Sequence, residues 1–345
     1  MSDSRPPVVL ITGAAGFLGA HLTRSLLADA RYDDHLLLAV DDLSGGFREN
    51  LPESERVEFA RLSVTDSPAM DQLFVDRNIC YVFHLAAYAA EGLSHFIRRF
   101  NYTNNLLGSV NLINAAVRHE VRHFVFTSSI AVYGAAQVPM KEDMLPVPED
   151  PYGISKLAVE LDLDCARRLF GLKYTVFRPH NVYGEYQNLG DRYRNVVGIF
   201  MNRIMQGEQL PVFGDGSQKR AFSYVADLMD PLVSCPFVPE AAGEVFNVGA
   251  STPTSVLELA HVVCREFDVE PQLDFQPPRD EVVNAWSDHS KCDRVFGPSS
   301  STSLEDGISN MAAWARQTGA RSSNRFSNIE ITRGLPPGWV NVVDE

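Results

Sequence analysis

The sequence has few basic residues, and lysine is the scarcest of them. Only five of the 345 residues are lysine, and the 30 lysines and arginines together face 44 aspartates and glutamates, so the net charge is −14. A protein this acidic is a poor partner for nucleic acid or for an anionic membrane surface. A local group of arginines can still oppose the global field and bind a small anionic ligand.

Cysteine is also sparse, and long apolar runs are missing. The five cysteines are an odd number at long spacings, with no C-x-x-C pair, which argues against a disulfide framework and a zinc site. We therefore expect no bound metal and a reducing compartment. No stretch reaches 18 uninterrupted apolar residues, and the first residues lack the basic and apolar regions of a signal peptide. These features predict a cytoplasmic protein.

The first half of the chain alternates short apolar runs with helical periodicity. Strands are predicted at residues 8–12, 36–40, 57–61, 79–86, 121–126 and 174–178, and helices at 17–30, 95–119 and 152–170. Alternation of this kind is typical of an α/β protein with a doubly wound parallel sheet of Rossmann type.

This alternation of strands and helices ends after residue 178. We predict a helix at 197–206, a strand at 244–248 and a helix at 255–267, followed by a segment, 271–300, that is rich in proline and serine. Residues 1–178 with about 226–250 are predicted to form the sheet domain. A smaller C-terminal lobe takes residues 179–225 and 251–345. Its tail, 321–345, has no regular period and is expected to pack irregularly or fray.

A glycine-rich turn joins the first strand to the first helix. Gly13, Gly16 and Gly19 follow the spacing G-x-x-G-x-x-G, which lets backbone N–H groups and the helix N-terminus approach a pyrophosphate. Asp41 ends the second strand, where an acid bonds the ribose hydroxyls of NAD, and Asp42 adds negative charge. No arginine directly follows that strand, which favours NAD over NADP. A plain strand–helix turn and a solvated acidic turn are the simpler interpretations.

Tyr152 and Lys156 lie one helical turn apart, so they share a helix face. A nearby ammonium group favours the phenolate and lowers the pKa of a tyrosine. The pair follows a predicted strand that ends in the hydroxyl-rich Thr127-Ser128-Ser129, on the edge of the sheet where ligands bind. An ordinary surface pair is the alternative.

Motifs along nearly the whole chain resemble one enzyme family. They are Gly13–Gly19, His84–Ala87, Asn104-Asn105, Phe126–Gly134, Pro151–Lys156, Arg178–Gly184, Phe213–Gly216 and Arg220–Asp227. In this order the chain, from residue 8 to about 310, resembles the extended short-chain dehydrogenase/reductase family, and especially nucleotide-sugar epimerases of the UDP-glucose 4-epimerase kind.

The resemblance implies a role for many residues. Ser129, Tyr152 and Lys156 would be catalytic, with Tyr152 as the base in a transient oxidation at C4. The sheet domain would bind NAD through Gly13, Gly16, Phe17, Leu18, Gly19, Asp41, Asp42, Ser63, Val64, Leu85, Ala86, Ala87, Asn104, Thr127, Tyr152 and Lys156. The lobe and neighbouring loops would bind the nucleotide sugar through Tyr88, Glu91, Ser128, Ser129, Asn181, Arg220 and Arg279. The family also implies a homodimer formed by helices 95–119 and 152–170.

The two residues after Ser129 discriminate among family members. Related 4,6-dehydratases carry an acid–base pair there, whereas this chain has Ile130 and Ala131, which cannot transfer protons. We therefore expect a 4-epimerase that interconverts UDP-glucose and UDP-galactose or a related UDP-hexose.

Three alternatives stay open. The loop 191–194, Asp-Arg-Tyr-Arg, would suit the carboxylate of UDP-glucuronate. Tyr88 and Glu91 would suit another nucleotide-sugar epimerase or reductase. A non-catalytic dinucleotide-binding sensor or scaffold is the alternative of a different class, because fold alone does not establish activity.

Overall fold

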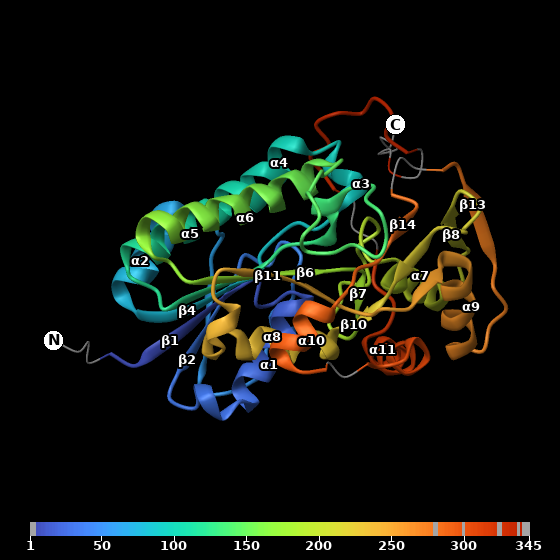
Figure 1. Cartoon of the computed structure of the whole chain (residues 1–345). Coiled ribbons are helices and arrows are strands. Elements are labelled where there is room, and N and C mark those ends of the chain that lie inside the picture. Colours follow the sequence, from blue (N-terminus) through green and yellow to red (C-terminus); the bar gives the residue numbers. More distant parts are fainter. Residues whose placement is uncertain (1–4, 279–281, 299–300, 323–325, 337–338, 340–345) are drawn as a thin grey trace.

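A parallel sheet of seven strands forms the centre of the molecule (Figure 1). The computed structural model describes residues 5–278, 282–298, 301–322, 326–336 and 339. The strand order is β11-β6-β5-β4-β1-β2-β3, and every neighbouring pair is parallel. The strands are β1 (Pro7–Thr12), β2 (Leu36–Asp41), β3 (Val57–Arg61), β4 (Asn78–His84), β5 (His123–Thr127), β6 (Tyr174–Pro179) and β11 (Glu244–Val248). The predicted doubly wound sheet is confirmed, and so is the late strand at 244–248.

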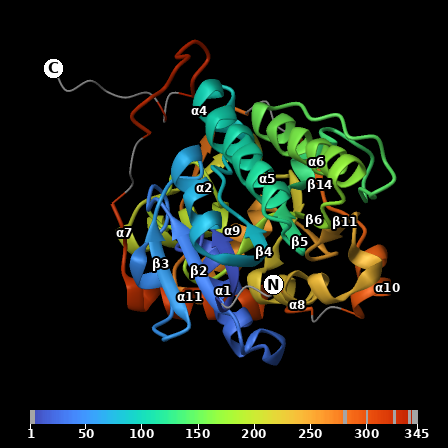
Figure 2. The same cartoon turned by 90° about the vertical axis from the view of Figure 1, so that its left-hand side faces the viewer.

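Helices cover both faces of this sheet (Figures 1 and 2). One face carries α1 (Phe17–Ala28), α8 (Met229–Ser234) and α10 (Ser290–Phe296), and the other carries α2 (Ser67–Asp76), α5 (Gly108–Arg118) and α6 (Pro151–Phe170). In β1, Val9 and Ile11 pack into the first core while Val8 and Leu10 pack into the second. Burial on both faces explains why this strand reads as a continuous apolar run.

The predicted long helix at 95–119 begins later than expected. The structure has a short α3 (Glu91–Ser94), then α4 (Arg98–Tyr102), a π-helical turn at Thr103–Leu107, and α5. The first three predicted residues are therefore outside the helix, because the chain at Ile97 turns out of helical geometry before α4 begins. Helix α2 was not predicted, since its buried face consists of little more than Met70 and Phe74.

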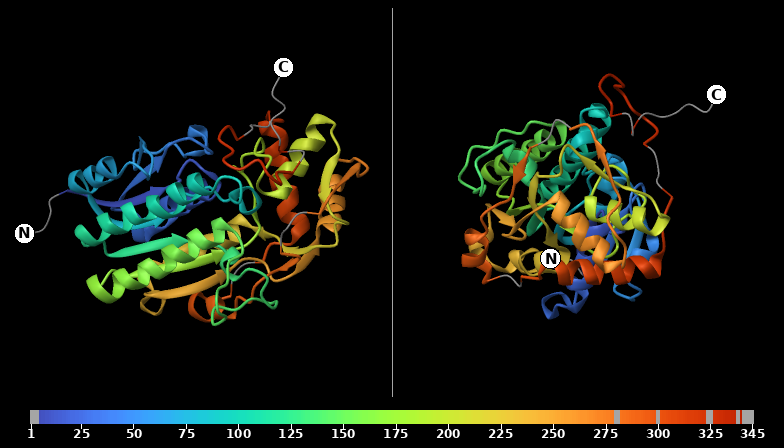
Figure 3. Two further views of the ribbon diagram at one scale, coloured as in Figure 1. Left: turned by 90° about the horizontal axis from the view of Figure 1, so that it is seen from above. Right: turned by 90° about the vertical axis from the view of Figure 1, so that its right-hand side faces the viewer.

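The smaller lobe lies beyond the carboxyl ends of the strands (Figure 3). Its helices are α7 (Val196–Gln206), α9 (Val256–Glu266) and α11 (Leu304–Thr318), which pack around one apolar core. Its strands are β7 (Val182–Tyr183) paired with β10 (Ser223–Tyr224), β8 (Leu210–Phe213) paired with β13 (Leu273–Gln276), and β9 (Lys219–Ala221) between β12 (Pro253–Ser255) and β14 (Asn284–Ala285). Helices α10 and α11 were not predicted, and α10 packs beneath the sheet against β11 and α8. The division into two domains stays a prediction.

A buried ion pair joins α6 to β6 beneath the strand ends. The guanidinium of Arg178 donates to both carboxylate oxygens of Glu160, at 3.0 and 2.5 Å, and also to the hydroxyl of Tyr133 at 2.7 Å. That hydroxyl donates to Asn247 on β11 at 2.9 Å, and Ser128 donates its own hydroxyl proton to Glu160. Because every polar group in the network has a partner, the buried charges are tolerated. In the described part of the chain, no helix is long and apolar enough to cross a membrane.

Removing one member of this ion pair should destabilise the fold severely. Arg178→Met leaves the Glu160 carboxylate buried without its cation, and we expect a loss of about 3–5 kcal/mol in the free energy of unfolding. Urea denaturation followed by circular dichroism measures this loss. The matched control is Arg168→Met, because Arg168 pairs with Asp164 on the exposed face of the same helix. Equal denaturation midpoints for the two variants would contradict the structural importance of the buried ion pair.

Candidate active site

A large cavity opens where the sheet meets the smaller lobe. Its volume is about 990 Å³, and its walls come from the carboxyl ends of the strands, the glycine turn and α7. Most residues predicted for the site line it: Gly13, Gly16, Phe17, Leu18, Gly19, Asp41, Asp42, Val64, Leu85, Ala86, Ala87, Tyr88, Glu91, Asn104, Thr127, Ser128, Ser129, Tyr152, Lys156, Asn181 and Arg220. The structure thus brings together side chains from separate parts of the sequence, and their roles stay proposals. Arg279 lies outside the described residues.

The glycine turn has room for backbone only. Gly13 has a φ of +70°, and a Cβ there would lie 2.8 Å from the amide nitrogen of Ala86. A Cβ on Gly19 would overlap the carbonyl oxygen of Gly13. The turn therefore packs directly against the end of β4 and leaves the N-terminus of α1 facing the cavity, which is the geometry that a pyrophosphate requires.

Asp41 fixes this turn to the end of β2. One carboxylate oxygen accepts from the amide of Ala15 at 3.0 Å and the other accepts from that of Leu43 at 2.8 Å. Burial raises the pKa of Asp41, while these backbone hydrogen bonds oppose the rise. Arg48 packs over the Phe59 ring, 4.9 Å from its centroid, and is not in the cavity lining. In the loop that follows β2, no guanidinium is therefore placed to bind the 2′-phosphate of NADP.

Two of the predicted site residues, Ser63 and Ser128, bond to other side chains in this structure, and their predicted roles stay predictions. The Ser63 hydroxyl bonds that of Thr65 at 2.9 Å, and Ser63 does not line the cavity, because the chain turns there and presents Leu62 and Val64 instead. The Ser128 hydroxyl donates to Glu160 and so belongs to the buried ion-pair network.

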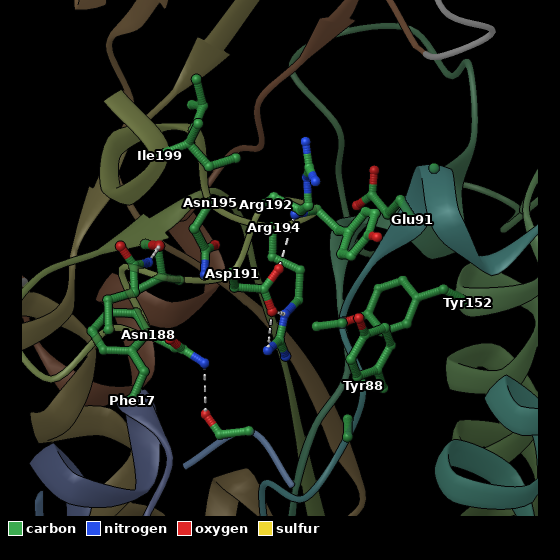
Figure 4. A pocket seen from close by; sticks show the side chains of 18 of the residues that line it. Phe17, Tyr88, Glu91, Tyr152, Asn188, Asp191, Arg192, Arg194, Asn195 and Ile199 are labelled. Carbon is green, nitrogen blue, oxygen red and sulfur yellow. Dashed lines mark hydrogen bonds and ion pairs between the residues drawn. The ribbon is translucent and has the colours of Figure 1, made fainter. Parts of the chain in front are cut away.

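Tyr152 lies at the inner end of the cavity with Tyr88, Glu91 and Arg194 around it (Figure 4). Burial raises the pKa of the phenol, the negative charge of Glu91 raises it further, and a hydrogen bond with Ser129 lowers it. The Ser129 hydroxyl also accepts from the amide of Ala131 at 3.1 Å, which fixes its position at the end of β5.

Lys156 is buried between the end of β5 and the ring of Tyr152. Its ammonium group donates to the carbonyl of Thr127 at 2.7 Å and lies 4.7 Å from the ring centroid of Phe126, but 5.8 Å from that of Tyr152. Burial lowers the pKa of Lys156 to about 7, against the opposing effect of Glu160. Burial therefore dominates the pKa of both Tyr152 and Lys156 in the protein alone, and the lowering of the phenol's pKa by Lys156 stays a prediction.

The substrate side of the cavity carries Asn181 and Arg220. Asn181 has a φ of +42° and lines the wall after β6. The guanidinium of Arg220 donates to the carbonyl of Val283 at 2.7 Å and to that of Val282, so its donors serve the neighbouring chain. Its predicted contact with a diphosphate stays a prediction.

Several lining residues lie outside the main predicted site, although the loop 191–194 was named for the UDP-glucuronate alternative. Arg194 lies over the Tyr88 ring, 4.7 Å from its centroid, and its Nε donates to Asp191 at 2.6 Å. Its positive charge also lowers the pKa of Tyr152. Leu335 and Trp339 come from the tail that was expected to pack irregularly or fray. Their only signal in the sequence is the presence of apolar side chains in a segment without periodicity.

Comparison with known proteins decides the family. Residues 9–249 match the model of the NAD dependent epimerase/dehydratase family. The chain belongs to this family. As an NAD-dependent nucleotide-sugar epimerase, it is similar to the UDP-glucose 4-epimerase of Mycolicibacterium smegmatis, with 34% identity over 89% of this chain and 98% of that protein.

Solved structures agree with this assignment. The UDP-glucose 4-epimerase of Thermotoga maritima, solved with UDP-glucose, superposes with a TM-score of 0.83 at 32% identity, over 90% of this chain and 99% of its own. The UDP-glucuronic acid 4-epimerase of Bacillus cereus, solved with UDP-glucuronic acid and NAD, has a TM-score of 0.83 at 26% identity, with the same coverage. NAD is therefore the cofactor of this epimerase. The cradle made by Gly13 and Gly19, which a Cβ would fill, and the carboxylate of Asp41 fit that cofactor.

The buried Lys156 should make the stability of the dinucleotide-free protein depend on pH. The unfolded lysine, with its ordinary pKa of 10.5, holds a proton that the folded lysine loses above pH about 7, so stability rises with pH between these values. From pH about 7.5 to about 9.5, the unfolding free energy should rise by about 2 kcal/mol more than in Lys156→Met. Urea titrations at several pH values in this range measure the free energy of unfolding. If this free energy changes with pH equally in the parent protein and in Lys156→Met, the prediction is contradicted.

Proposed function

We propose that this epimerase interconverts UDP-glucose and UDP-galactose, or a closely related UDP-hexose, by reversible oxidation at C4. The observation that carries the proposal is the position of Tyr152 and Ser129 together in the cavity, with Ile130 and Ala131 in place of acids directly after Ser129 in the sequence. Ile130 is buried there in an apolar cluster with Val132 and Met140. Elimination of water would need a proton-transfer group at this place, whereas inversion at C4 needs only one base.

The chain's own residues would carry out the proton transfer. NAD, when bound, supplies the acceptor and donor of the hydride. Tyr152 takes the proton of the C4 hydroxyl, Ser129 holds that hydroxyl, and Tyr152 later returns the proton to the inverted centre. The phenolate needed for this step is disfavoured by burial and by Glu91 and is favoured by Arg194 and Ser129. The cavity, about 990 Å³, gives the keto sugar space to turn over before reduction.

UDP-glucuronate is the second candidate substrate, and one observation favours it. Arg194 lies in the cavity wall near Tyr152, where a guanidinium would bind a carboxylate on C5 (Figure 4). However, the carboxylate of Asp191 already pairs with this guanidinium, and Glu91 adds a second negative charge at the same end. This balance of charge favours a neutral hexose.

Turnover should depend on the phenol of Tyr152. Tyr152→Phe is expected to lower kcat by about 10³-fold or more with little change in KM, because it removes the proton-transfer group and leaves the ring. Products from UDP-glucose, UDP-galactose and UDP-glucuronate are resolved by chromatography. Tyr224→Phe is the matched control, since Tyr224 donates to Glu185 outside the cavity lining.

Two outcomes would overturn the substrate assignment. No C4 epimer from UDP-glucose or UDP-galactose would exclude a UDP-hexose of this kind. Solvent deuterium at C3 or C5 of the product would show proton abstraction at carbon, with Glu91 as the candidate base, in place of simple inversion at C4. An unchanged kcat in Tyr152→Phe would remove this residue from the mechanism.

We also propose a homodimer built on α5 and α6, in the cytoplasm. Supporting it, α6 exposes large apolar side chains at Leu161, Leu169 and Phe170, which are 61%, 75% and 62% exposed. Apolar area of this kind favours association. Sedimentation at micromolar concentration should show a dimer, and Leu161→Glu combined with Leu169→Glu should give a monomer. A monomeric parent protein would contradict the proposal.

A further inference from the structure

The described part of the C-terminal tail, residues 326–336 and Trp339, packs against the body of the protein. Residues 326–336 lie beside the start of α4 (Figures 1 and 2). The amides of Glu330 and Ile331 donate to the carbonyl of Phe96 at 2.8 and 3.2 Å. The Glu330 carboxylate accepts from the amides of Arg99 and Phe100, both at 2.8 Å. These bonds satisfy N–H groups at the start of a helix and anchor the tail there.

An aromatic cluster extends this anchor toward the cavity. Phe326 packs against Phe100 and Tyr88, with ring centroids 4.9 and 5.4 Å apart. Trp339 packs edge-on against Tyr193, 5.3 Å between centroids, and Tyr193 also accepts from the amide of Phe326 at 3.2 Å. The tail therefore contacts both the loop that holds Tyr88 and the loop that holds Arg194.

The tail forms part of the cavity wall at one end. Gly334, Leu335, Pro336 and Trp339 line the cavity, and Leu335 and Trp339 are only 9% and 6% exposed. The apolar cluster that contains Leu335 and Trp339 also contains Ala90, which precedes Glu91, and Leu93, two residues after it. Its members come from the Tyr88–Phe100 region, the Tyr193 loop and the tail, and none comes from the β2 and β3 ends that hold the adenosine side.

We propose that the tail is the apolar wall of the sugar subsite, with Trp339 as the side chain against which the hexose ring packs. The inference rests on the proposed function, because it assigns this end of the cavity to the sugar. The part of the rigid indole that borders the cavity is apolar, and the carbon-bound hydrogens of a pyranose provide a matching surface. The wall contacts the hexose and not the dinucleotide. It therefore strengthens binding of the sugar nucleotide, whereas binding of NAD does not depend on the wall.

A binding experiment on the holoenzyme tests this wall without relying on turnover. In a protein whose other two tryptophans are replaced, Trp286→Phe and Trp314→Phe, the emission of Trp339 should change on adding UDP-glucose but not on adding UDP alone. Trp339→Ala should weaken UDP-glucose binding by about tenfold in calorimetry, which corresponds to about 1.4 kcal/mol. The affinity for UDP and the amount of bound NAD should stay within about twofold of the parent protein.

The matched control is Ile331→Ala, in the same tail. Ile331 is 42% exposed and does not line the cavity, so UDP-glucose binding should be unchanged. Two results would overturn the proposed wall and leave the proposed function intact. UDP-glucose would bind the single-tryptophan protein without altering Trp339 emission, or it would bind Trp339→Ala with unchanged affinity. If the parent protein binds UDP-glucose no more tightly than UDP, both the wall and the proposed function would be overturned.

Discussion

The buried ion pair between Glu160 and Arg178 is the constraint on which the site depends. It joins α6, which carries Tyr152 and Lys156, to β6, and through Ser128 it also holds the end of β5. Two charges withdrawn from water are stable only when their hydrogen bonds are complete, so the network permits little variation in the spacing of these elements. The positions of Ser129, Tyr152 and Lys156 relative to one another follow from that rigidity.

Burial, and not charge alone, sets the electrostatics of the catalytic end. It lowers the pKa of Lys156 to about 7 and raises that of Tyr152, so in the protein alone burial shifts both groups toward their neutral forms. Arg194 and Glu91 act on the phenol in opposite directions from the cavity wall. The proton affinity of Tyr152 is thus balanced between opposing neighbours, and the positive charge of the oxidised cofactor would shift that balance toward the phenolate.

The substrate end is assembled from three distant parts of the chain. The loop after β4 provides Tyr88 and Glu91, the loop before α7 provides Asp191 and Arg194, and the tail provides Leu335 and Trp339. Family membership is established over residues 9–249, and the tail lies beyond that range. Features that distinguish this epimerase from its relatives are therefore most to be expected where the tail meets the two loops.

Local sequence patterns were enough to predict the sheet, the glycine turn, the order of the strands in the chain and the Tyr152–Lys156 pair, because periodicity and turn chemistry are local properties of the chain. The same patterns placed β3 and β11 at their observed bounds but missed α2, α10 and α11, whose short or weak apolar faces gain stability only from packing. The hydrogen-bond partners of Ser63 and Ser128, the direction of the Tyr152 pKa shift and the place of the tail in the cavity follow from three-dimensional packing. Each of these features depends on burial and on partners far away in sequence. Burial and distant partners cannot be inferred from neighbouring residues alone.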